Sequence, residues 1–402
     1  MGERAAGTEG PGPGGMRPWR FVVWLGVVSL LADFVYEGAR SVTGPLLASL
    51  GASALVVGVV TGAGEAAALG LRLVSGPLAD RTRRFWGLSI GGYALTVLSV
   101  PPLGVVGVLW AACALVIAER VGKAVRSPAK DTLLSHATAA TGRGRGFAVH
   151  EAMDQVGALV GPLTVAGVLA LSGGAYGPAL GVLAVPGLVV LGLLFRLRAR
   201  VPDPEAYERR APAPPGAPRP DGRLPAAFWT YAAFTATTTA GFATFGVLSY
   251  HLVQRHLMTA SWVPVLYAAA MAVDAVAALA SGWLYDRIGP RVLAVLPVLA
   301  AAVPALAFTH TVALAVAGSL VWGAAVGIQE STLRATVADL VPSPRRATAY
   351  GFFAGVVGGA SLAGGALTGA LYGHSVPLLI TVVAALQALA LVLLAVTGPG
   401  RA

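Results

Sequence analysis

The amino-acid sequence predicts an all-α polytopic membrane protein, with twelve transmembrane helices arranged in two pseudo-symmetric six-helix bundles. Three observations support this fold class. The 402-residue chain is 56% hydrophobic and 11% charged, with a mean hydropathy of +0.74, whereas about a quarter of the residues in soluble domains are charged. Apolar windows of about 20 residues, long enough to span a bilayer, recur along almost the whole chain. Short motifs also recur in the same order in its two halves.

The chain divides into a tail, two bundles and a linker. Residues 1–18 are rich in Gly and Pro, so we expect a disordered cytoplasmic tail. The N-terminal bundle, 19–197, is predicted to contain spans at 21–49, 54–78, 85–105, 108–136, 146–171 and 176–196. Residues 198–225 are rich in Pro and Arg and are predicted to form a cytoplasmic linker. The C-terminal bundle, 226–398, is predicted to contain spans at 226–254, 261–284, 291–308, 311–338, 347–372 and 376–397.

The net charge of +10 comes from basic residues in alternate loops. Loops 49–54, 101–107 and 172–177 contain no Lys or Arg, whereas the loops between them contain several Arg residues. This positive-inside pattern predicts that both termini are cytoplasmic, and it argues against a nucleic-acid partner. The Ala-, Gly- and Arg-rich composition, with two lysines, is typical of a GC-rich bacterial genome, so we expect a multi-pass protein of the bacterial plasma membrane.

Three motifs repeat between the two halves. SGPLADR at 75–81 recurs as SGWLYDR at 281–287, Arg126 with Asp131 recurs as Arg334 with Asp339, and Gly146-Phe147 recurs as Gly351-Phe352. Duplicated six-span bundles are expected to place a binding site between the halves, near the bilayer midplane.

The Gly-x-x-x-Asp-Arg motif after the second span of each half resembles the signature loop of the major facilitator superfamily of secondary transporters. The resemblance covers nearly the whole chain, from about Trp19 to Val396. The first copy contains Gly76, Leu78, Asp80, Arg81, Arg83 and Arg84, and the second contains Gly282, Leu284, Asp286, Arg287, Gly289 and Arg291. Arg83 stands where the family usually has Gly.

The resemblance implies a cytoplasmic gate. We expect the glycines to allow close helix contact, the carboxylates to cap a neighbouring helix N-terminus, and Arg81 and Arg84 to pair with Asp131. The alternative is that these charges only orient the chain in the membrane. The predicted gate residues are Gly76, Asp80, Arg81, Arg84, Arg126, Asp131, Gly282, Asp286, Arg287, Arg334 and Asp339.

The fifth span contains a second, narrower resemblance. Its sequence GALVGPLTVAG, with Gly157, Gly161 and Pro162, is similar to a Gly-x-x-x-Gly-Pro element of proton-driven exporters in this superfamily. Small residues allow close helix packing and the proline bends the helix. The two glycines that usually follow the proline are replaced by Val165 and Ala166.

Charged residues inside predicted spans are the clearest functional signal. Each would cost about 2.5–3.5 kcal/mol at the centre of the bilayer unless it is paired or faces water. Glu37 can pair with Arg40, three residues away on the same helix, whereas Asp274 has no basic residue close by on its own span. The predicted proton-coupling and substrate-cavity residues are Asp33, Glu37, Arg40, Glu65, Arg72, Arg120, Lys123, Glu151, Asp154 and Asp274.

Asp33 is the first candidate for a proton carrier, because Glu37 lies closer to Arg40 and Asp33 is thereby left without it. Glu37 is expected to exchange Arg40 for substrate. For any one of these residues, the alternative is an ion pair that only orders the bundle.

The sequence thus predicts a monomeric secondary transporter that moves a small organic solute by proton-coupled efflux, and not an enzyme. It predicts no cofactor and no metal site. Because the chain has no nucleotide-binding Gly-x-x-x-x-Gly-Lys motif, the expected energy source is the proton gradient. Two alternatives remain open. One is a proton-coupled importer, and the other is a membrane-embedded enzyme that uses the buried carboxylates.

Overall fold

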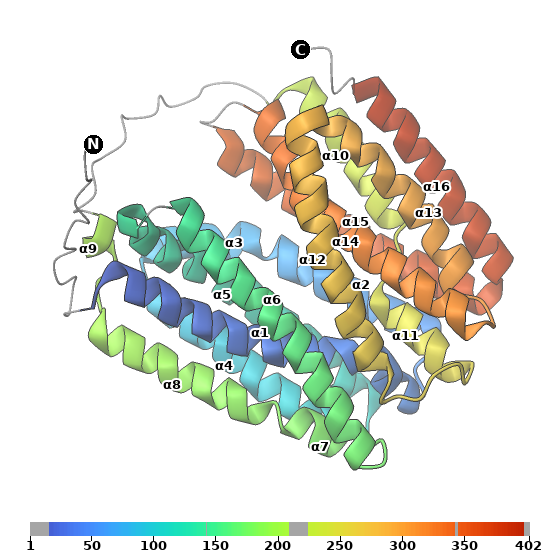
Figure 1. The fold of residues 1–402 in the computed structure, drawn as a ribbon, viewed down its shortest axis with the longest axis horizontal. Coiled ribbons are helices and arrows are strands. Elements are labelled where there is room, and N and C mark those ends of the chain that lie inside the picture. The colour runs from blue at the N-terminus through green and yellow to red at the C-terminus, as the bar shows by residue number, and fades with distance from the viewer. Residues whose placement is uncertain (1–15, 142, 209–223, 342–344, 398–402) are drawn as a thin grey trace, which may run out of the picture.

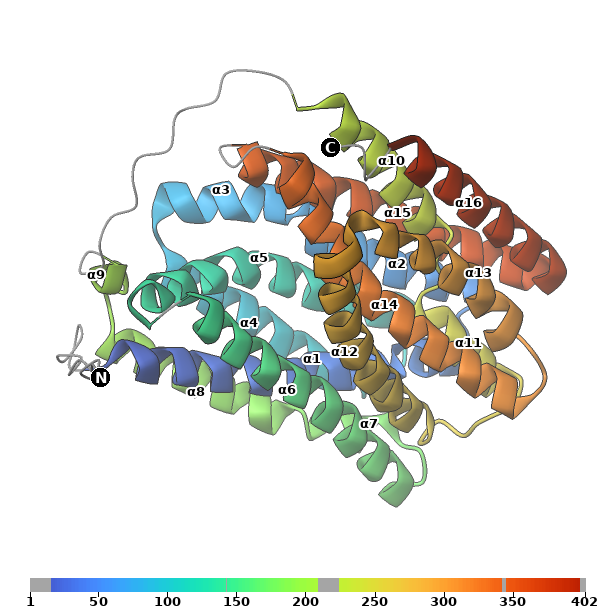
Figure 2. The same ribbon diagram turned by 45° about the horizontal axis from the view of Figure 1, so that its top comes forward.

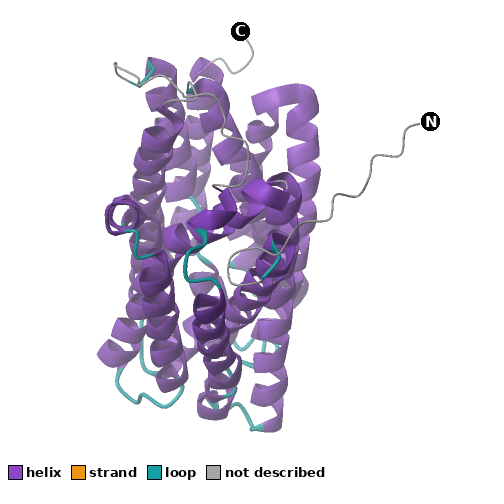
Figure 3. Ribbon diagram, turned by 90° about the vertical axis from the view of Figure 1, so that its left-hand side faces the viewer, coloured by secondary structure: helices purple, strands orange, loops and turns teal. Residues whose placement is uncertain are grey.

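The computed structural model describes residues 16–141, 143–208, 224–341 and 345–397, and its elements are helices (Figures 1, 2 and 3). Most of the predicted tail, most of the predicted linker and residue 398 lie outside the described residues. The first half contains α1 (Pro18–Ser49), α2 (Ala54–Gly70), α3 (Arg72–Thr82), α4 (Phe85–Leu103), α5 (Leu109–Thr141), α6 (Arg143–Leu171), α7 (Tyr176–Gly181), α8 (Ala184–Arg200) and α9 (Glu205–Glu208). The second half contains α10 (Ala226–Ala240), α11 (Phe245–Gln254), α12 (Val263–Ile288), a 3₁₀ helix (Gly289–Ala294), α13 (Val295–Ala307), α14 (Val312–Leu340), α15 (Arg346–His374) and α16 (Val376–Thr397).

The predicted spans correspond to these helices. Within the described residues, eight segments are long and apolar enough to cross a membrane, and one of them, Val263–Ala307, contains both α12 and α13. Helices α4 and α5 and the pair α10–α11 occupy the other predicted spans. The chain therefore has the all-α, twelve-span architecture that its sequence predicts.

Three spans that were predicted as continuous helices are broken. The second span is divided into α2 and α3 at Leu71. The sixth is divided into α7 and α8 between Gly181 and Ala184, because Pro186 has no N–H to donate to the carbonyl of Val182. The seventh is divided into α10 and α11 around Gly241, and Thr244 caps the new helix by accepting a hydrogen bond from the Val247 N–H at 3.4 Å. The break around Gly241 lies in the wall of a cavity between the two halves.

The two halves share a hydrophobic core at one end only. At the end of α1 near Ser49, one cluster contains residues of both halves, including Leu46 and Val57 with Phe245 and Leu248. At the opposite end, near Pro18 and Thr397, each half has a separate core. The molecule is therefore closed between its halves at one end, and the halves separate toward the end that carries the termini (Figure 1).

Close contact between α2 and α15 joins the halves along one side. A Cβ atom added at Gly62 would lie 2.7 Å from the carbonyl oxygen of Ser361, and Gly58 and Gly365 abut each other's carbonyl groups. Contacts this short are possible only because both helices have glycine at these positions. This glycine-lined seam was not predicted from the sequence.

Candidate functional site

A cavity of about 720 Å³ lies between the two halves and contains charged side chains from both. Its charged lining residues are Asp33, Glu37, Arg40, Glu65, Arg72, Arg120, Lys123, Glu151, Asp154, Asp274, Glu330 and Arg334. All residues that were predicted as a substrate cavity line it, from helices α1, α2, α3, α5, α6 and α12. Their transport roles stay predictions.

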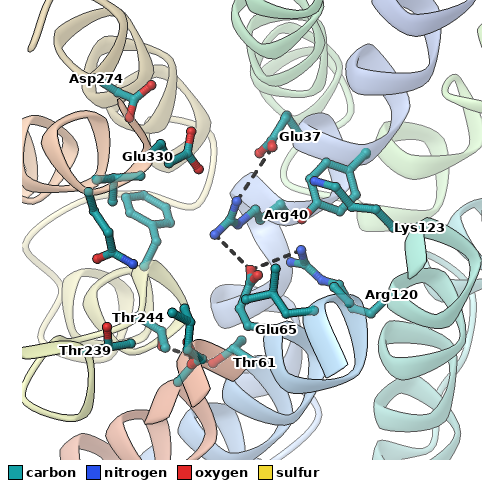
Figure 4. Close-up of a pocket in the computed structure, with 18 of the residues that line it drawn as sticks. Glu37, Arg40, Thr61, Glu65, Arg120, Lys123, Thr239, Thr244, Asp274 and Glu330 are labelled. Atoms are coloured by element: carbon teal, nitrogen blue, oxygen red, sulfur yellow. Dashed lines mark hydrogen bonds and ion pairs between the residues drawn. The ribbon is translucent and has the colours of Figure 1, made fainter. Parts of the chain in front are cut away.

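Glu65 is the centre of an ion-pair network (Figure 4). Its Oε1 lies 3.0 Å from Arg40 Nη2 and 3.2 Å from Arg120 Nη1. Arg40 also lies 3.6 Å from Glu37 Oε1, as the i,i+3 spacing indicated. The carboxylate of Glu65 thus joins three helices, and Arg120, which is 4% exposed, is charged inside the protein because it has a partner.

Tyr36 provides a second contact for the cations of this half. The Lys123 ammonium lies 3.6 Å from the centroid of its ring, and the Arg120 guanidinium carbon lies 4.6 Å from it. An aromatic face attracts cations through its quadrupole. Tyr36 was not among the predicted site residues, although it lies between Asp33 and Glu37 in the sequence.

A third group of charges lies around Lys130, toward the open end. Its ammonium is 3.9 Å from Asp154 Oδ2 and 3.9 Å from Asp131 Oδ1, and it donates a hydrogen bond to the Ser29 hydroxyl at 3.0 Å. His150 Nδ1 lies 3.4 Å from Asp154 Oδ2. Sequence reasoning did not single out Lys130 as the partner of Asp154.

The predicted pairing of Arg81 and Arg84 with Asp131 is wrong in this structure. Both arginines are exposed, and within the described parts of the chain neither makes an ion pair, while Asp131 pairs with Lys130. Arg126, which was predicted to act with Asp131, is 2% exposed and lies over the ring of Tyr93 at 4.5 Å. All three residues of the predicted pairing belong to the first half, and the cation that reaches Asp131 is its neighbour in the sequence, Lys130.

The two signature glycines do not make the close contacts that were predicted. A Cβ atom at Gly76 would come no closer than 4.0 Å to Pro128, and one at Gly282 would meet nothing within 4 Å. The backbone conformation explains why the second copy of the motif has a glycine at position 289. Gly289 has φ +66°, and Arg83, which stands at the matching position of the first copy, also has a positive φ of 51°. The Arg83 side chain lies 3.3 Å from Glu205.

The remaining predicted gate residues are also at this end of the molecule. Asp339 accepts a hydrogen bond from the Tyr285 hydroxyl at 2.7 Å, and the Arg287 guanidinium lies 3.5 Å from the centroid of the Trp283 ring. Arg334 lines the cavity. Asp80 and Asp286 are exposed and, within the described residues, take part in no ion pair. Among the described residues, no ion pair joins the two halves at this end.

The second half contributes two carboxylates without cationic partners. Asp274 is 4% exposed and its Oδ1 has no hydrogen-bond partner, and neither Asp274 nor Glu330 makes an ion pair within the described residues. Figure 4 shows both carboxylates across the cavity from Arg40 and Glu37. Glu330 was not among the predicted cavity residues, although its position on the tenth span placed a charge within the membrane region.

Aromatic rings of the second half line the same cavity as these carboxylates. Phe242 and Trp322 stack with their centroids 6.3 Å apart and their planes 5° apart, and Phe245 lies 5.3 Å from Trp322. The indole of Trp322 donates to the Ala243 carbonyl at 2.8 Å, which holds the ring in place. The cavity therefore combines charged groups with aromatic side chains.

Polar contacts close the cavity at its far end. The hydroxyls of Thr61 on α2 and Thr244 before α11 lie 3.0 Å apart, and the Tyr267 hydroxyl donates to Glu37 Oε2 across the two halves. Gly44 of α1 contacts the backbone of Gly246. These contacts define the closed end of the cavity.

The glycines of the fifth span pack within the first half. Gly157 on α6 abuts the backbone of Leu30, and Gly161 abuts that of Phe34, so α1 and α6 touch on both sides of Asp33. The close packing that the Gly-x-x-x-Gly-Pro pattern indicated is present, between α6 and α1.

No group of three or more His, Cys, Asp or Glu side chains suited to a metal ion occurs in the described part of the chain. His251, at the closed end, is hydrogen-bonded through Nδ1 to the Tyr372 hydroxyl and through Nε2 to the Thr309 carbonyl, both at 2.9 Å.

Comparisons with known proteins place this architecture in a family. The model of the Major Facilitator Superfamily matches residues 25–257 and 253–402. An uncharacterized protein of Mycobacterium tuberculosis is 66% identical over 379 residues, which cover 94% of this chain and 92% of that protein. An uncharacterized MFS-type transporter of Methanocaldococcus jannaschii is 29% identical over 140 residues, or 35% of each chain.

Solved structures share the fold at low sequence identity. The nucleoside transporter NupG superposes with a TM-score of 0.70 at 14% identity, over 94% of this chain and 98% of that one. A bacterial homologue of the human lysosomal transporter Spinster, inward-facing and unoccupied, gives 0.67 at 16%, over 95% and 96% of the two chains. A POT family transporter in complex with 5-aminolevulinic acid gives 0.70 at 14%, over 94% and 95%. With its family match, its twelve-span fold and a cavity between its halves, this chain belongs to the Major Facilitator Superfamily of secondary transporters.

Proposed function

We propose that this transporter exports a small organic solute across the plasma membrane of a bacterium and couples export to proton entry. The observation that carries the proposal is the cavity between the halves, in which carboxylates and guanidinium groups form a network that a proton or a solute would rearrange. Alternating access would expose this cavity first to one side and then to the other.

Asp33 and Glu37 support proton coupling. They share one face of α1, four residues apart, and both line the cavity. Glu37 is bound to Arg40 and Tyr267, whereas Asp33 takes part in no ion pair within the residues described. A carboxylate that lies inside the protein and forms no ion pair is suited to bind and release a proton. We therefore assign proton binding to Asp33 and the exchange of Arg40 for solute to Glu37.

Export is favoured by the fifth-span element and its packing. Gly157 and Gly161 hold α6 against α1 beside Asp33, so a movement of α6 would be transmitted directly to this carboxylate. Each proton that enters down the membrane potential contributes about 2.3 kcal/mol per 100 mV, which can drive a solute outward. The positive-inside pattern supports cytoplasmic termini, and the cavity would then be open to the cytoplasm, where an exported solute is collected.

The test is a flux measurement in proteoliposomes that enclose a pH-sensitive dye and carry an imposed pH gradient. Organic amines, acids and neutral solutes are added one at a time to wild-type protein and to Asp33→Asn. We expect one class of solute to cause proton movement opposite to its own flux, and Asp33→Asn to abolish that movement.

Each other outcome would overturn part of the proposal. Parallel flows of solute and protons would make the protein an importer. Solute movement without proton movement would refute proton coupling. Normal coupled transport by Asp33→Asn would show that this carboxylate only orders the bundle.

A further inference from the structure

We infer that the transported solute carries a positively charged amine, which binds at the carboxylates of Asp274 and Glu330 while its apolar part lies against Phe242, Phe245 and Trp322. This substrate class deepens the proposed transport function and rests on it.

The first observation is the unpartnered carboxylate of Asp274. Its side chain lines the cavity, is 4% exposed, and has an Oδ1 without any hydrogen-bond partner. A buried carboxylate is costly unless a donor or a cation accompanies it. An ammonium group supplies both a positive charge and three hydrogen-bond donors. Asp274 is thus a vacant acceptor that faces the space a solute would occupy (Figure 4).

Helix packing places Glu330 in the same wall. Gly327 on α14 abuts the backbone carbonyl of Asp274 on α12, and Glu330 follows Gly327 by one helical turn. Glu330 also lines the cavity, and in the described chain it makes no ion pair with Arg334, which lies one turn further along α14. Two carboxylates on one wall can both contact a bound cation, so that the cation has a negative charge on two of its sides.

The cations near the closed end already have partners. Arg40 pairs with Glu37 and Glu65, Arg120 pairs with Glu65, and Lys123 lies over the ring of Tyr36. Arg72 and Arg334 also line the cavity, and within the described residues they form no ion pair. They lie toward the open end, so a carboxylate on the same solute would be directed there, away from Asp274. The charge pattern favours an amine or an amino acid-like zwitterion over a simple anion.

The aromatic wall defines the rest of the solute. Phe242 and Trp322 are stacked with their planes within 5°, and Phe245 lies 5.3 Å from Trp322, tilted by 47°, and all three line the cavity. Aromatic side chains in a cavity pack against an apolar or aromatic group of a ligand, and ring faces attract a neighbouring cation. The site therefore fits an arylalkylamine better than a sugar, which needs several hydrogen-bond partners.

The inference can be tested by binding alone, without any gradient. Purified full-length protein in detergent is titrated by calorimetry with 2-phenylethylamine, 2-phenylethanol and 3-phenylpropionate, which share one ring and differ in charge. We expect the amine to bind at least about tenfold more tightly than the alcohol and the acid. Asp274→Asn and Glu330→Gln should each weaken amine binding by about tenfold, whereas Glu205→Gln, outside the cavity, should leave it unchanged.

Equal affinity for amine and alcohol, or no amine binding at millimolar concentration, would overturn the inference. Unchanged amine binding in both Asp274→Asn and Glu330→Gln would also overturn it. If Asp274→Asn does not fold, the comparison of the three probes on wild-type protein and on Glu330→Gln decides the question. Amine binding without coupled flux would refute the proposed proton coupling alone, and coupled flux of anions without amine binding would refute this substrate class alone.

Discussion

Glu65 shows how a single residue holds charges from three helices together. Its Oε1 forms an ion pair with Arg40 and accepts a hydrogen bond from Arg120, two guanidinium groups that the sequence places far apart. The i,i+3 pair of Glu37 and Arg40 could be predicted from the sequence, because helix geometry sets that spacing. The position of Glu65 between two arginines could not, because it depends on how α1, α2 and α5 pack.

Replacement of Glu65 by Gln should destabilise the protein by about 1–3 kcal/mol, since the ion pairs with Arg40 and Arg120 lose their anion and, among the described residues, the buried Arg120 keeps only Glu119 as an ion-pair partner, at 3.4 Å. This loss of stability is smaller than that expected for a fully buried ion pair, because the Glu65 side chain is 27% exposed. The measurement is the thermal unfolding midpoint in detergent.

A matched control for Glu65→Gln is Glu205→Gln. The partner of Glu205 is Arg83, which is 73% exposed, so loss of this pair should cost less than about 0.5 kcal/mol. If the two variants unfold at the same temperature, the network around Glu65 does not contribute to stability.

At the scale of helices, the seam between α2 and α15 is the closest contact between the halves. Gly365 faces the carbonyl of Gly58, and Gly369 faces that of Ala54. The run GGASLAGGALTG at 358–369 is visible in the sequence as a cluster of small residues, which is typical of helix packing in membranes. The sequence did not indicate which helix would be the partner.

Gly365→Leu should therefore disrupt the closed end and strongly reduce transport, because its side chain would occupy the position of the α2 backbone. The matched control is Gly359→Leu on the same helix, where an added Cβ meets nothing within 4 Å. Both variants are compared by solute flux in proteoliposomes and by the thermal unfolding midpoint. Equal behaviour of the two variants would show that α2 and α15 tolerate separation at Gly365.

At the scale of the whole molecule, the shared core at one end and the separate cores at the other define one state of an alternating-access cycle (Figure 1). The hydroxyls of Thr61 and Thr244 meet across the two halves at the closed end, 3.0 Å apart. In the opposite state these residues must separate, because the cavity would open between them.

A disulfide between Thr61→Cys and Thr244→Cys should lock this state. In a Cys113→Ser background, which removes the natural cysteine, oxidation is expected to abolish transport and a reducing agent to restore it. The single variant Thr61→Cys in the same background is the control and should be insensitive to the oxidant. Full transport by the oxidised double variant, with the disulfide confirmed by mass spectrometry, would contradict a cycle in which this end opens.

The sequence by itself determined the fold class, the positions of the spans and most of the charges that face the cavity, although it missed Glu330. Apolar length identifies spans, and the cost of a charge in the bilayer requires it to face water or a partner, so Asp33, Glu37 and Arg40 on one span had to point inward. Duplicated motifs identified the two halves. These inferences need only local periodicity and the energetics of the solvent.

Only the tertiary structure decided which charges pair and which stay without partners. Lys130 took the place predicted for Arg81 and Arg84 beside Asp131, because the two arginines, on α3 and before α4, point outward from the first half. Asp274 and Glu330 came together because Gly327 brings α14 against α12. Ion pairs across helices depend on rotation and separation of whole helices, and the periodicity of a single span contains no information about either.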